Sequence, residues 1–191
     1  MHLLSQLIIR RENNKDHEPV YSLIESAFNR SSESALVEKL RYSDAAIPEL
    51  SLVATLHNKI VGHILFTKIK IINDQQIATS ALALAPLSVL PQFQNKGIGK
   101  RLIETGLEKA KELGYKLVSV LGHADYYPRF GFLPAGRFHI EAPIAVPPQN
   151  FMVIELTDGA LEETTGLVEY APEFNILSAR VRSGLIIETE R

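Results

Sequence analysis

Cysteine is absent from the 191 residues, and its absence excludes several kinds of chemistry. Without thiols the chain can form no disulfide, no thiolate metal site and no cysteine nucleophile, so an acyl-cysteine intermediate is excluded. Lysine and arginine never form a run longer than two residues, and the formal net charge is only −2. Neither nucleic acid nor an anionic membrane surface is therefore indicated as a partner.

Long apolar runs are missing as well. No stretch of the sequence is long enough to span a bilayer, and residues 1–6 lack the charged and apolar segments of a secretory signal. The histidines outside the motifs below show no metal-ligand spacing, so no metal is expected. We therefore expect a cytoplasmic protein. The hydrophobic content of 46% is enough for the core of one domain with a small appendage.

The spacing of apolar residues predicts an α+β fold. Helices are expected over 16–28, 32–42 and 98–113, and strands over 7–12, 50–56, 60–72, 77–90, 116–121 and 151–156. Short turns join the strands between 50 and 90, which favours an antiparallel meander. Strand 77–90, the helix after it and strand 116–121 form a βαβ unit, so these two strands should be parallel. We expect a mixed, mostly antiparallel sheet of about seven strands with helices on both faces.

One proline interrupts this pattern. Pro86 stands inside the expected strand 77–90, and proline cannot donate a hydrogen bond to a neighbouring strand. We therefore expect a bulge or a break in pairing near Ala85 and Pro86.

The loop between this strand and the next helix carries the clearest functional signal. It reads Gln-Asn-Lys-Gly-Ile-Gly-Lys over 94–100. Its two glycines let the backbone approach a ligand, and the helix that follows presents free N–H groups and a positive dipole end. Lys96, Lys100 and Arg101 add positive charge, so the loop favours a phosphate. The dinucleotide fingerprint would need glycine in place of Leu102, and the Walker pattern would need Ser or Thr in place of Arg101.

The pattern that remains, Gln-x-x-Gly-x-Gly, resembles the acetyl-CoA loop of the GCN5-related N-acetyltransferase (GNAT) superfamily. A second motif of that family, Tyr-x-x-x-Gly-Phe, is matched by Tyr127, Gly131 and Phe132. One helix and one strand separate the two motifs, as in the family. With Ala-Pro-Leu-Ser-Val at 85–89, the chain looks like the bacterial subgroup of YhbS-like predicted N-acetyltransferases over roughly residues 7–156.

The resemblance implies an enzyme that transfers an acetyl group from acetyl-CoA to a primary amine by direct attack in a ternary complex. The implied cofactor-binding residues are Leu87, Val89, Gln94, Asn95, Lys96, Gly97, Ile98, Gly99 and Lys100. We expect an acetyltransferase domain over 1–156 and a C-terminal extension over 157–191 that packs on it. A non-catalytic acyl-CoA-binding or sensing module on the same fold stays open. The acceptor, a small-molecule or peptide amine, and a homodimer are also left open.

The resemblance also suggests where the proton transfers occur. Tyr127 matches the family tyrosine that protonates the departing thiolate, and Tyr126 should face elsewhere. The base is left open among Glu33, His123 and Asp125, and many relatives use an ordered water instead. Glu33 lies in a polar corner between two helices, and His123 follows a parallel strand, where ligands gather in α/β sheets. In one departure from the family, Val120 stands where many members carry a cofactor-binding asparagine.

Overall fold

The computed structural model describes residues 3–175 of the chain. Its helices are α1 (His17–Phe28), α2 (Ser32–Arg41) and α3 (Ile98–Glu112). Its strands are β1 (Ile8–Arg11), β2 (Ser51–Leu56), β3 (Lys59–Ile72), β4 (Ala78–Val89), β5 (Leu117–Leu121), β6 (Leu133–Pro134), β7 (Ile140–Glu141), β8 (Phe151–Glu155) and β9 (Gly166–Glu169). The described residues form a nine-stranded sheet, somewhat larger than expected, because β6, β7 and β9 are too short to leave a pattern in the sequence.

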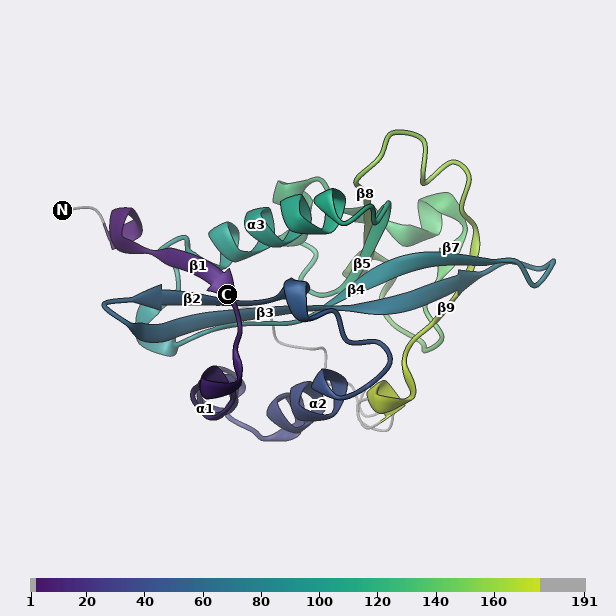
Figure 1. Cartoon of the computed structure of the whole chain (residues 1–191). Helices are drawn as coiled ribbons and strands as arrows, with labels where there is room; N and C mark the ends of the chain where they lie inside the picture. The colour runs from purple at the N-terminus through teal and green to yellow at the C-terminus, as the bar shows by residue number, and fades with distance from the viewer. Residues whose placement is uncertain (1–2, 176–191) are drawn as a thin grey trace.

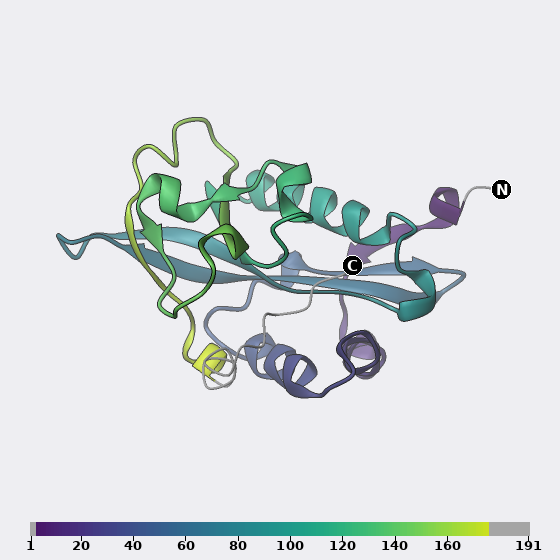
Figure 2. The ribbon, with the colours of Figure 1, turned by 180° about the vertical axis from the view of Figure 1, so that it is seen from behind.

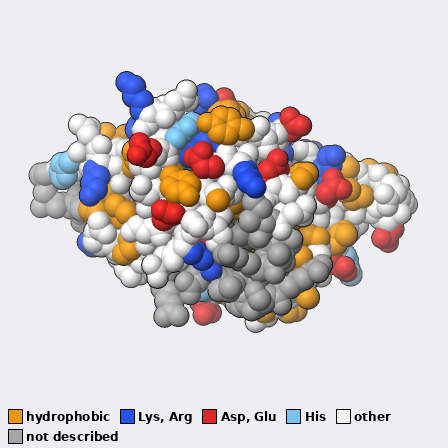
Figure 3. All heavy atoms as spheres, turned by 90° about the horizontal axis from the view of Figure 1, so that it is seen from below, with side chains coloured by type: hydrophobic (Ala, Val, Ile, Leu, Met, Phe, Trp, Pro, Cys, Tyr) orange, Lys and Arg blue, Asp and Glu red, His pale blue; other side chains and the backbone are white. Residues whose placement is uncertain are grey.

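The sheet is sandwiched between helices. Helices α1 and α2 lie on one face and α3 lies on the other, as Figure 1 and the view from behind in Figure 2 show. The predicted placement of helices on both faces is confirmed. On the face that carries α1 and α2, acidic and basic side chains are interspersed, with no continuous basic patch among the described residues in view (Figure 3). In the described part of the chain, every helix is too short or too polar to cross a membrane.

The order of the strands confirms both expected motifs. The main path is β1-β2-β3-β4-β5-β8-β6. Strands β1 to β4 are antiparallel neighbours, as a meander requires. Strand β4 pairs in parallel with β5, where Leu82 faces Val118 and Leu84 faces Val120. The βαβ unit therefore places the N-terminus of α3 beyond the end of β4.

Strands β4 and β5 separate soon after they meet. Their last paired residues are Leu84 and Val120, whereas β4 continues along β3 as far as Val89. We call this point of separation the fork. The Ala85–Pro86 peptide bond is cis, and the register between β3 and β4 shifts next to it, which confirms the irregularity expected from Pro86.

Helix α3 packs very closely on the sheet. The apolar side chains of its sheet-facing side include Ile98, Leu102 and Ile103, each at 1% exposure or less. At Gly106 a Cβ atom would lie 2.3 Å from the Phe66 ring on β3. Only glycine therefore fits at this crossing, and the distance between α3 and the sheet is fixed by it.

A buried ion network joins β1, β2 and β3 to α2. Glu12 accepts hydrogen bonds from Arg41 Nη2, at 2.6 Å, and from the Ser51 hydroxyl. The Ser51 hydroxyl also contacts His63 Nε2 at 3.1 Å. Burial alone would raise the pKa of Glu12, but interactions with His63, Arg41 and Ser51 outweigh it and hold this pKa well below its usual value. The network therefore holds an ionised carboxylate inside the protein.

The described part of the C-terminal extension joins the sheet. Leu167 on β9 faces Ile72 of β3 on one side and Glu141 of β7 on the other. Gly166 begins this strand with φ +128°, and a Cβ there would lie 2.1 Å from the Ile72 carbonyl oxygen. Residues 176–191 lie outside the described residues, so the proposed division at 156 stays a prediction.

Candidate active site

The loop before α3 is held in shape by its own side chains. A short 3₁₀ turn over Pro91–Phe93 follows β4, and Gln94 Nε2 then donates to the Val89 carbonyl at 3.1 Å. Lys96 Nζ donates to the Gln92 carbonyl at 2.6 Å. The backbone turns through left-handed conformations at Asn95, with φ 58°, and at Gly97, with φ 83°. Gln94 therefore anchors the loop to the end of β4.

The N-terminus of α3 is open to an anion. Gly97 is its N-cap, no side chain caps it within the described chain, and its first turn contains no acidic residue. The N–H groups of that first turn have no acceptor within the helix, and the helix dipole places positive charge at this end. Lys100 adds a mostly exposed ammonium group. These residues fit the diphosphate of coenzyme A, which N–H groups at 97–100 would bind.

Three of the nine cofactor-binding candidates have side chains that are buried in the core. Leu87, Val89 and Ile98 have 1% exposure or less and belong to the core beneath α3, so their side chains support the site from inside. Beyond the fork, however, no part of β5 is paired with β4. The β4 backbone from Ala85 to Ser88 is therefore available on that edge for an extended ligand arm, whereas the Val89 carbonyl already accepts from Gln94.

Tyr127 lies in the core rather than on the surface. It begins a 3₁₀ turn over Tyr127–Phe130 and is 0% exposed. Its ring makes edge contacts with Tyr126, at 5.4 Å between centroids, and with Phe132, at 5.6 Å. The turn follows β5 in the sequence, so Tyr127 lies on the segment that continues from the β5 side of the fork.

Glu33 is held in an ion pair. It lies on α2, is 2% exposed, and accepts from Arg30 Nε at 2.9 Å and from the Ser32 hydroxyl at 2.9 Å. Arg30 Nη2 approaches it at 2.6 Å. Because its oxygens already accept these hydrogen bonds, the Glu33 carboxylate stabilises the connection between α1 and α2.

His123 stands between β5 and the Tyr127 turn. Its carbonyl accepts from the Tyr126 backbone N–H at 3.1 Å. Its Nε2 atom is buried and has no hydrogen-bond partner among the described residues. Asp125, the other open candidate, is exposed. Of the three, His123 alone combines a position beside the fork with a buried, unengaged nitrogen.

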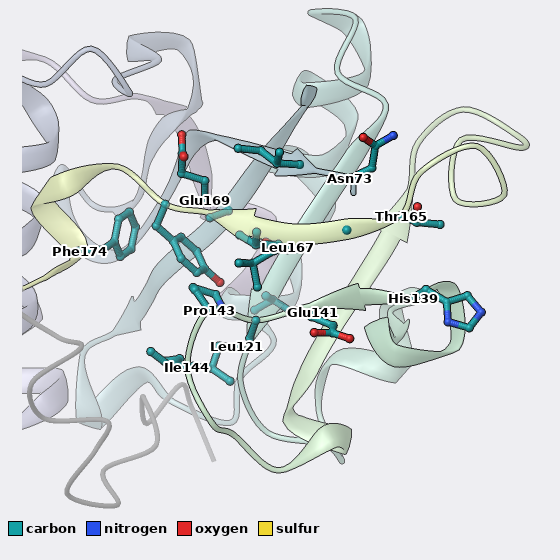
Figure 4. Close-up of a pocket in the computed structure, with 18 of the residues that line it drawn as sticks. Asn73, Leu121, His139, Glu141, Pro143, Ile144, Thr165, Leu167, Glu169 and Phe174 are labelled. Carbon is teal, nitrogen blue, oxygen red and sulfur yellow. The ribbon is translucent and has the colours of Figure 1, made fainter. Parts of the chain in front are cut away.

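A cavity of about 1180 Å³ opens beside the fork. Its lining includes Leu84 on β4 and Val120 on β5. The remaining walls come from the β3–β4 turn, from β7 with the residues after it, and from β9 (Figure 4). None of Tyr127, Glu33 and His123 is part of the described lining.

Sequence reasoning missed Ser119 and Tyr170, which meet at this cavity. Ser119 lies on β5 opposite Ala83, and its hydroxyl donates to the Leu82 carbonyl at 3.3 Å. Burial raises the pKa of Tyr170 to about 12, although a hydrogen bond with Ser119 lowers it. No local motif marks Tyr170, because it reaches the fork only through the pairing of β9 with β3. The available signal was an aromatic residue two positions after the apolar pair Leu167 and Val168.

Sequence comparisons agree with this geometry. The model of the acetyltransferase (GNAT) family matches residues 17–132. The uncharacterised N-acetyltransferase YjhQ of Escherichia coli strain K12 is 44% identical over 125 residues, which are 65% of this chain and 68% of that protein. The uncharacterised N-acetyltransferase YhbS of the same strain is 31% identical over 170 residues, which are 88% of this chain and 99% of YhbS.

Solved structures show the same fold. The crystal structure of YhbS from E. coli in complex with CoA superposes with a TM-score of 0.83 at 31% identity, covering 89% of this chain and 92% of that one. A GNAT family acetyltransferase from Brucella melitensis in complex with acetyl-CoA gives a TM-score of 0.71 at 28% identity, covering 88% and 97%.

The chain belongs to the GNAT family. It is an acyl-CoA-dependent N-acetyltransferase, and acetyl-CoA is its co-substrate. The expected resemblance and fold are thereby confirmed. Within residues 3–175 no cluster of His, Asp and Glu side chains is arranged to hold a metal ion.

Proposed function

We propose that this enzyme transfers the acetyl group of acetyl-CoA directly to a primary amine in a ternary complex. The observation that carries the proposal is the fork. It leaves the β4 backbone free beyond Leu84, between an uncapped helix N-terminus and a cavity large enough for a second substrate. Both substrates can therefore reach one point at the same time, and the chain contains no cysteine to carry the acetyl group between them.

The proposed reaction exchanges one bond for another. The amine nitrogen attacks the thioester carbonyl carbon, a C–N bond forms, and the C–S bond breaks. CoA departs as a thiolate that takes a proton from Tyr127. The reference pKa values of a thiol and a phenol lie within about two units of each other, so this transfer is feasible near neutral pH. The amine loses one proton to His123 or to water, and Tyr127 is reprotonated by exchange with solvent.

The structure supports different roles for the candidate bases. The buried Nε2 atom of His123 has no partner among the described residues, which suits a group that must accept a proton. Glu33 already accepts from Arg30 and Ser32, so we assign it to the structure of the α1–α2 corner. Asp125 is exposed and is given no role.

Release of free CoA thiol from acetyl-CoA in the presence of a panel of amines tests this proposal. We expect release that depends on an amine and yields an equal amount of N-acetylated product by mass spectrometry. Thiol release without any acetylated amine would indicate a hydrolase and would contradict the proposal. Binding of acetyl-CoA with no turnover of any amine would favour the sensing module.

A further inference from the structure

The cavity reaches the point at which acetyl transfer is proposed to occur. Its lining includes Leu84 and Ala85 on β4 and Val120 and Leu121 on β5, which are the residues of the fork. No described residue of the loop 91–97 or of α3 is part of the lining. The cavity and the helix N-terminus are therefore separate approaches to the fork. With the helix N-terminus assigned to acetyl-CoA, the cavity is left for the amine.

The described lining of the cavity carries negative charge. Its ionisable groups are Asp74, His139, Glu141, Glu169 and Tyr170, and it contains neither lysine nor arginine. Glu169 has a cation nearby, because Lys70 lies 3.9 Å from it at the surface. A concave surface lined by carboxylates attracts cations and repels anions.

Glu141 is well placed to contribute that charge. It faces Leu167 across the β7–β9 ladder, and both residues line the cavity. Figure 4 shows the Glu141 carboxylate on the same side of β9 as Leu121 and Pro143, whereas the Glu169 carboxylate points away on the other side of that strand. Glu141 is therefore the lining carboxylate that a ligand between β7 and the fork would meet.

A polar pair stands at the fork end of the same cavity. The Tyr170 phenol and the Ser119 hydroxyl share a hydrogen bond, and Ser119 donates to the Leu82 carbonyl. The phenol is thus left to donate to Ser119, and its oxygen lone pairs remain able to accept from an amine N–H. Tyr170 is also fixed by its ring contact with Phe174, at 5.1 Å between centroids.

We propose that the cavity is the acceptor site and that it selects a small amine with a second positive charge. Tyr170 positions the reacting nitrogen, and Glu141 binds the distal cation. This inference rests on the proposed acetyltransferase function. The reacting nitrogen donates an N–H to the Tyr170 oxygen and keeps its lone pair for the thioester carbon. Tyr170 neither gains nor loses a proton in this step, which makes it a positioning residue.

A matched set of amines tests the charge preference directly. Putrescine, n-butylamine and γ-aminobutyrate share a four-carbon chain and differ in the distal group, which is positive, neutral or negative. With saturating acetyl-CoA, we expect the KM of putrescine to be about tenfold lower than that of n-butylamine, as for a hydrogen bond to a charged group, and γ-aminobutyrate to be the poorest substrate. Equal kcat/KM for putrescine and n-butylamine would overturn the inference.

Two variants locate the preference in the cavity. Glu141→Gln should raise the KM of putrescine about tenfold more than that of n-butylamine. Glu141 and Glu162 are both exposed, but only Glu141 lines the cavity. The control Glu162→Gln therefore removes the same charge outside the lining and should leave the KM of both amines unchanged. Tyr170→Phe should raise the KM of both amines while the affinity for acetyl-CoA, measured by calorimetry, stays the same. If neither Glu141→Gln nor Tyr170→Phe changes amine kinetics, the acceptor binds elsewhere.

The remaining outcomes separate this inference from the function on which it rests. If calorimetry shows no binding of acetyl-CoA, both are overturned. If acetyl-CoA binds and amines are acetylated without preference for the diamine, only the inference is overturned. If octanoyl-CoA reacts faster than acetyl-CoA and diamines gain no advantage, the cavity holds the acyl chain, and the inference is again wrong.

Discussion

At the scale of single residues, the burial of Tyr127 determines how its role can be tested. Tyr127→Phe keeps the ring that packs between Tyr126 and Phe132 and removes only the proton donor. General acid catalysis contributes about 10²–10⁴-fold, so kcat should fall by that factor. The affinity for acetyl-CoA should stay nearly unchanged. The kcat is measured with one identified amine, and the affinity for acetyl-CoA is measured by calorimetry.

The neighbouring tyrosine supplies the control. Tyr126 is half-buried, and Tyr126→Phe should lose much less activity. Full activity in Tyr127→Phe would exclude Tyr127 as the acid. A greater loss of activity in Tyr126→Phe would assign the acid role to Tyr126 instead.

Glu12 is a residue whose contribution should depend on pH. Its pKa is lower in the folded protein than in the unfolded chain, so it stabilises the fold above the unfolded value of about 4.3. That contribution is lost as the pH falls through the folded pKa. We expect Glu12→Gln to reduce the free energy of unfolding by about 3 kcal/mol near neutral pH, because Arg41 loses its buried partner.

Urea unfolding of wild type and Glu12→Gln at about pH 7 and about pH 3 measures this difference. The difference between the two proteins should shrink at the lower pH. The exposed Glu162→Gln control should stay within about 0.5 kcal/mol of wild type. A difference that is the same at both pH values would show that the carboxylate charge of Glu12 contributes nothing.

Sequence reasoning could not find the Glu12 network. Glu12 directly follows β1, whereas Arg41, Ser51 and His63 lie on α2, β2 and β3, so no local spacing connects the four residues. Tyr127 and the Gln94–Lys100 loop could be proposed as site residues from the sequence because each belongs to a motif of residues that are neighbours in the chain. Residues that converge only after the sheet forms leave no such trace.

At the scale of elements, α3 illustrates how well periodicity sets boundaries. The helix was expected over 98–113 and runs over Ile98–Glu112, because its apolar stripe and the glycine after it mark both ends. Strands β7 and β9 were not predicted. Each has at most four residues, too few for an alternating pattern, and β9 is fixed by its pairing with β3 and β7.

The first turn of α3 gives a prediction at this scale. Gly99→Val places a branched side chain among the N–H groups that we assign to the diphosphate. We expect the dissociation constant for acetyl-CoA, measured by calorimetry, to rise by at least about tenfold. The thermal unfolding midpoint of the free protein should change little.

Gly136→Val is the matched control for this variant. A Cβ at Gly136 has nothing within 4 Å, so acetyl-CoA affinity should not change. Wild-type affinity in Gly99→Val would place the diphosphate elsewhere.

At the scale of the whole molecule, acetyl-CoA should stabilise the fold. It would bind α3 and the free edge of β4, which only the folded chain brings together. At about 100 times its dissociation constant, a ligand specific for the folded state adds about 2.7 kcal/mol. For a chain of this size the unfolding midpoint should rise by about 5–10 °C.

The same thermal scan tests cofactor selectivity. CoA should shift the midpoint much as acetyl-CoA does, because both combine the diphosphate with the extended arm assigned to the free edge of β4, an arm that ATP and NAD lack. ATP and NAD at equal concentration should shift it far less. A shift with ATP as large as that with CoA would mean that the loop 94–100 recognises phosphate alone.

The path of β9 has a consequence for how this enzyme can diversify. The family match ends at residue 132, whereas β7, β9 and Tyr170 in the cavity wall all lie beyond it. Coenzyme recognition and the wall facing the proposed acceptor are thus encoded in separate stretches of one gene product. Substitutions after residue 132 can then alter which amine is accepted, while the coenzyme loop is inherited unchanged.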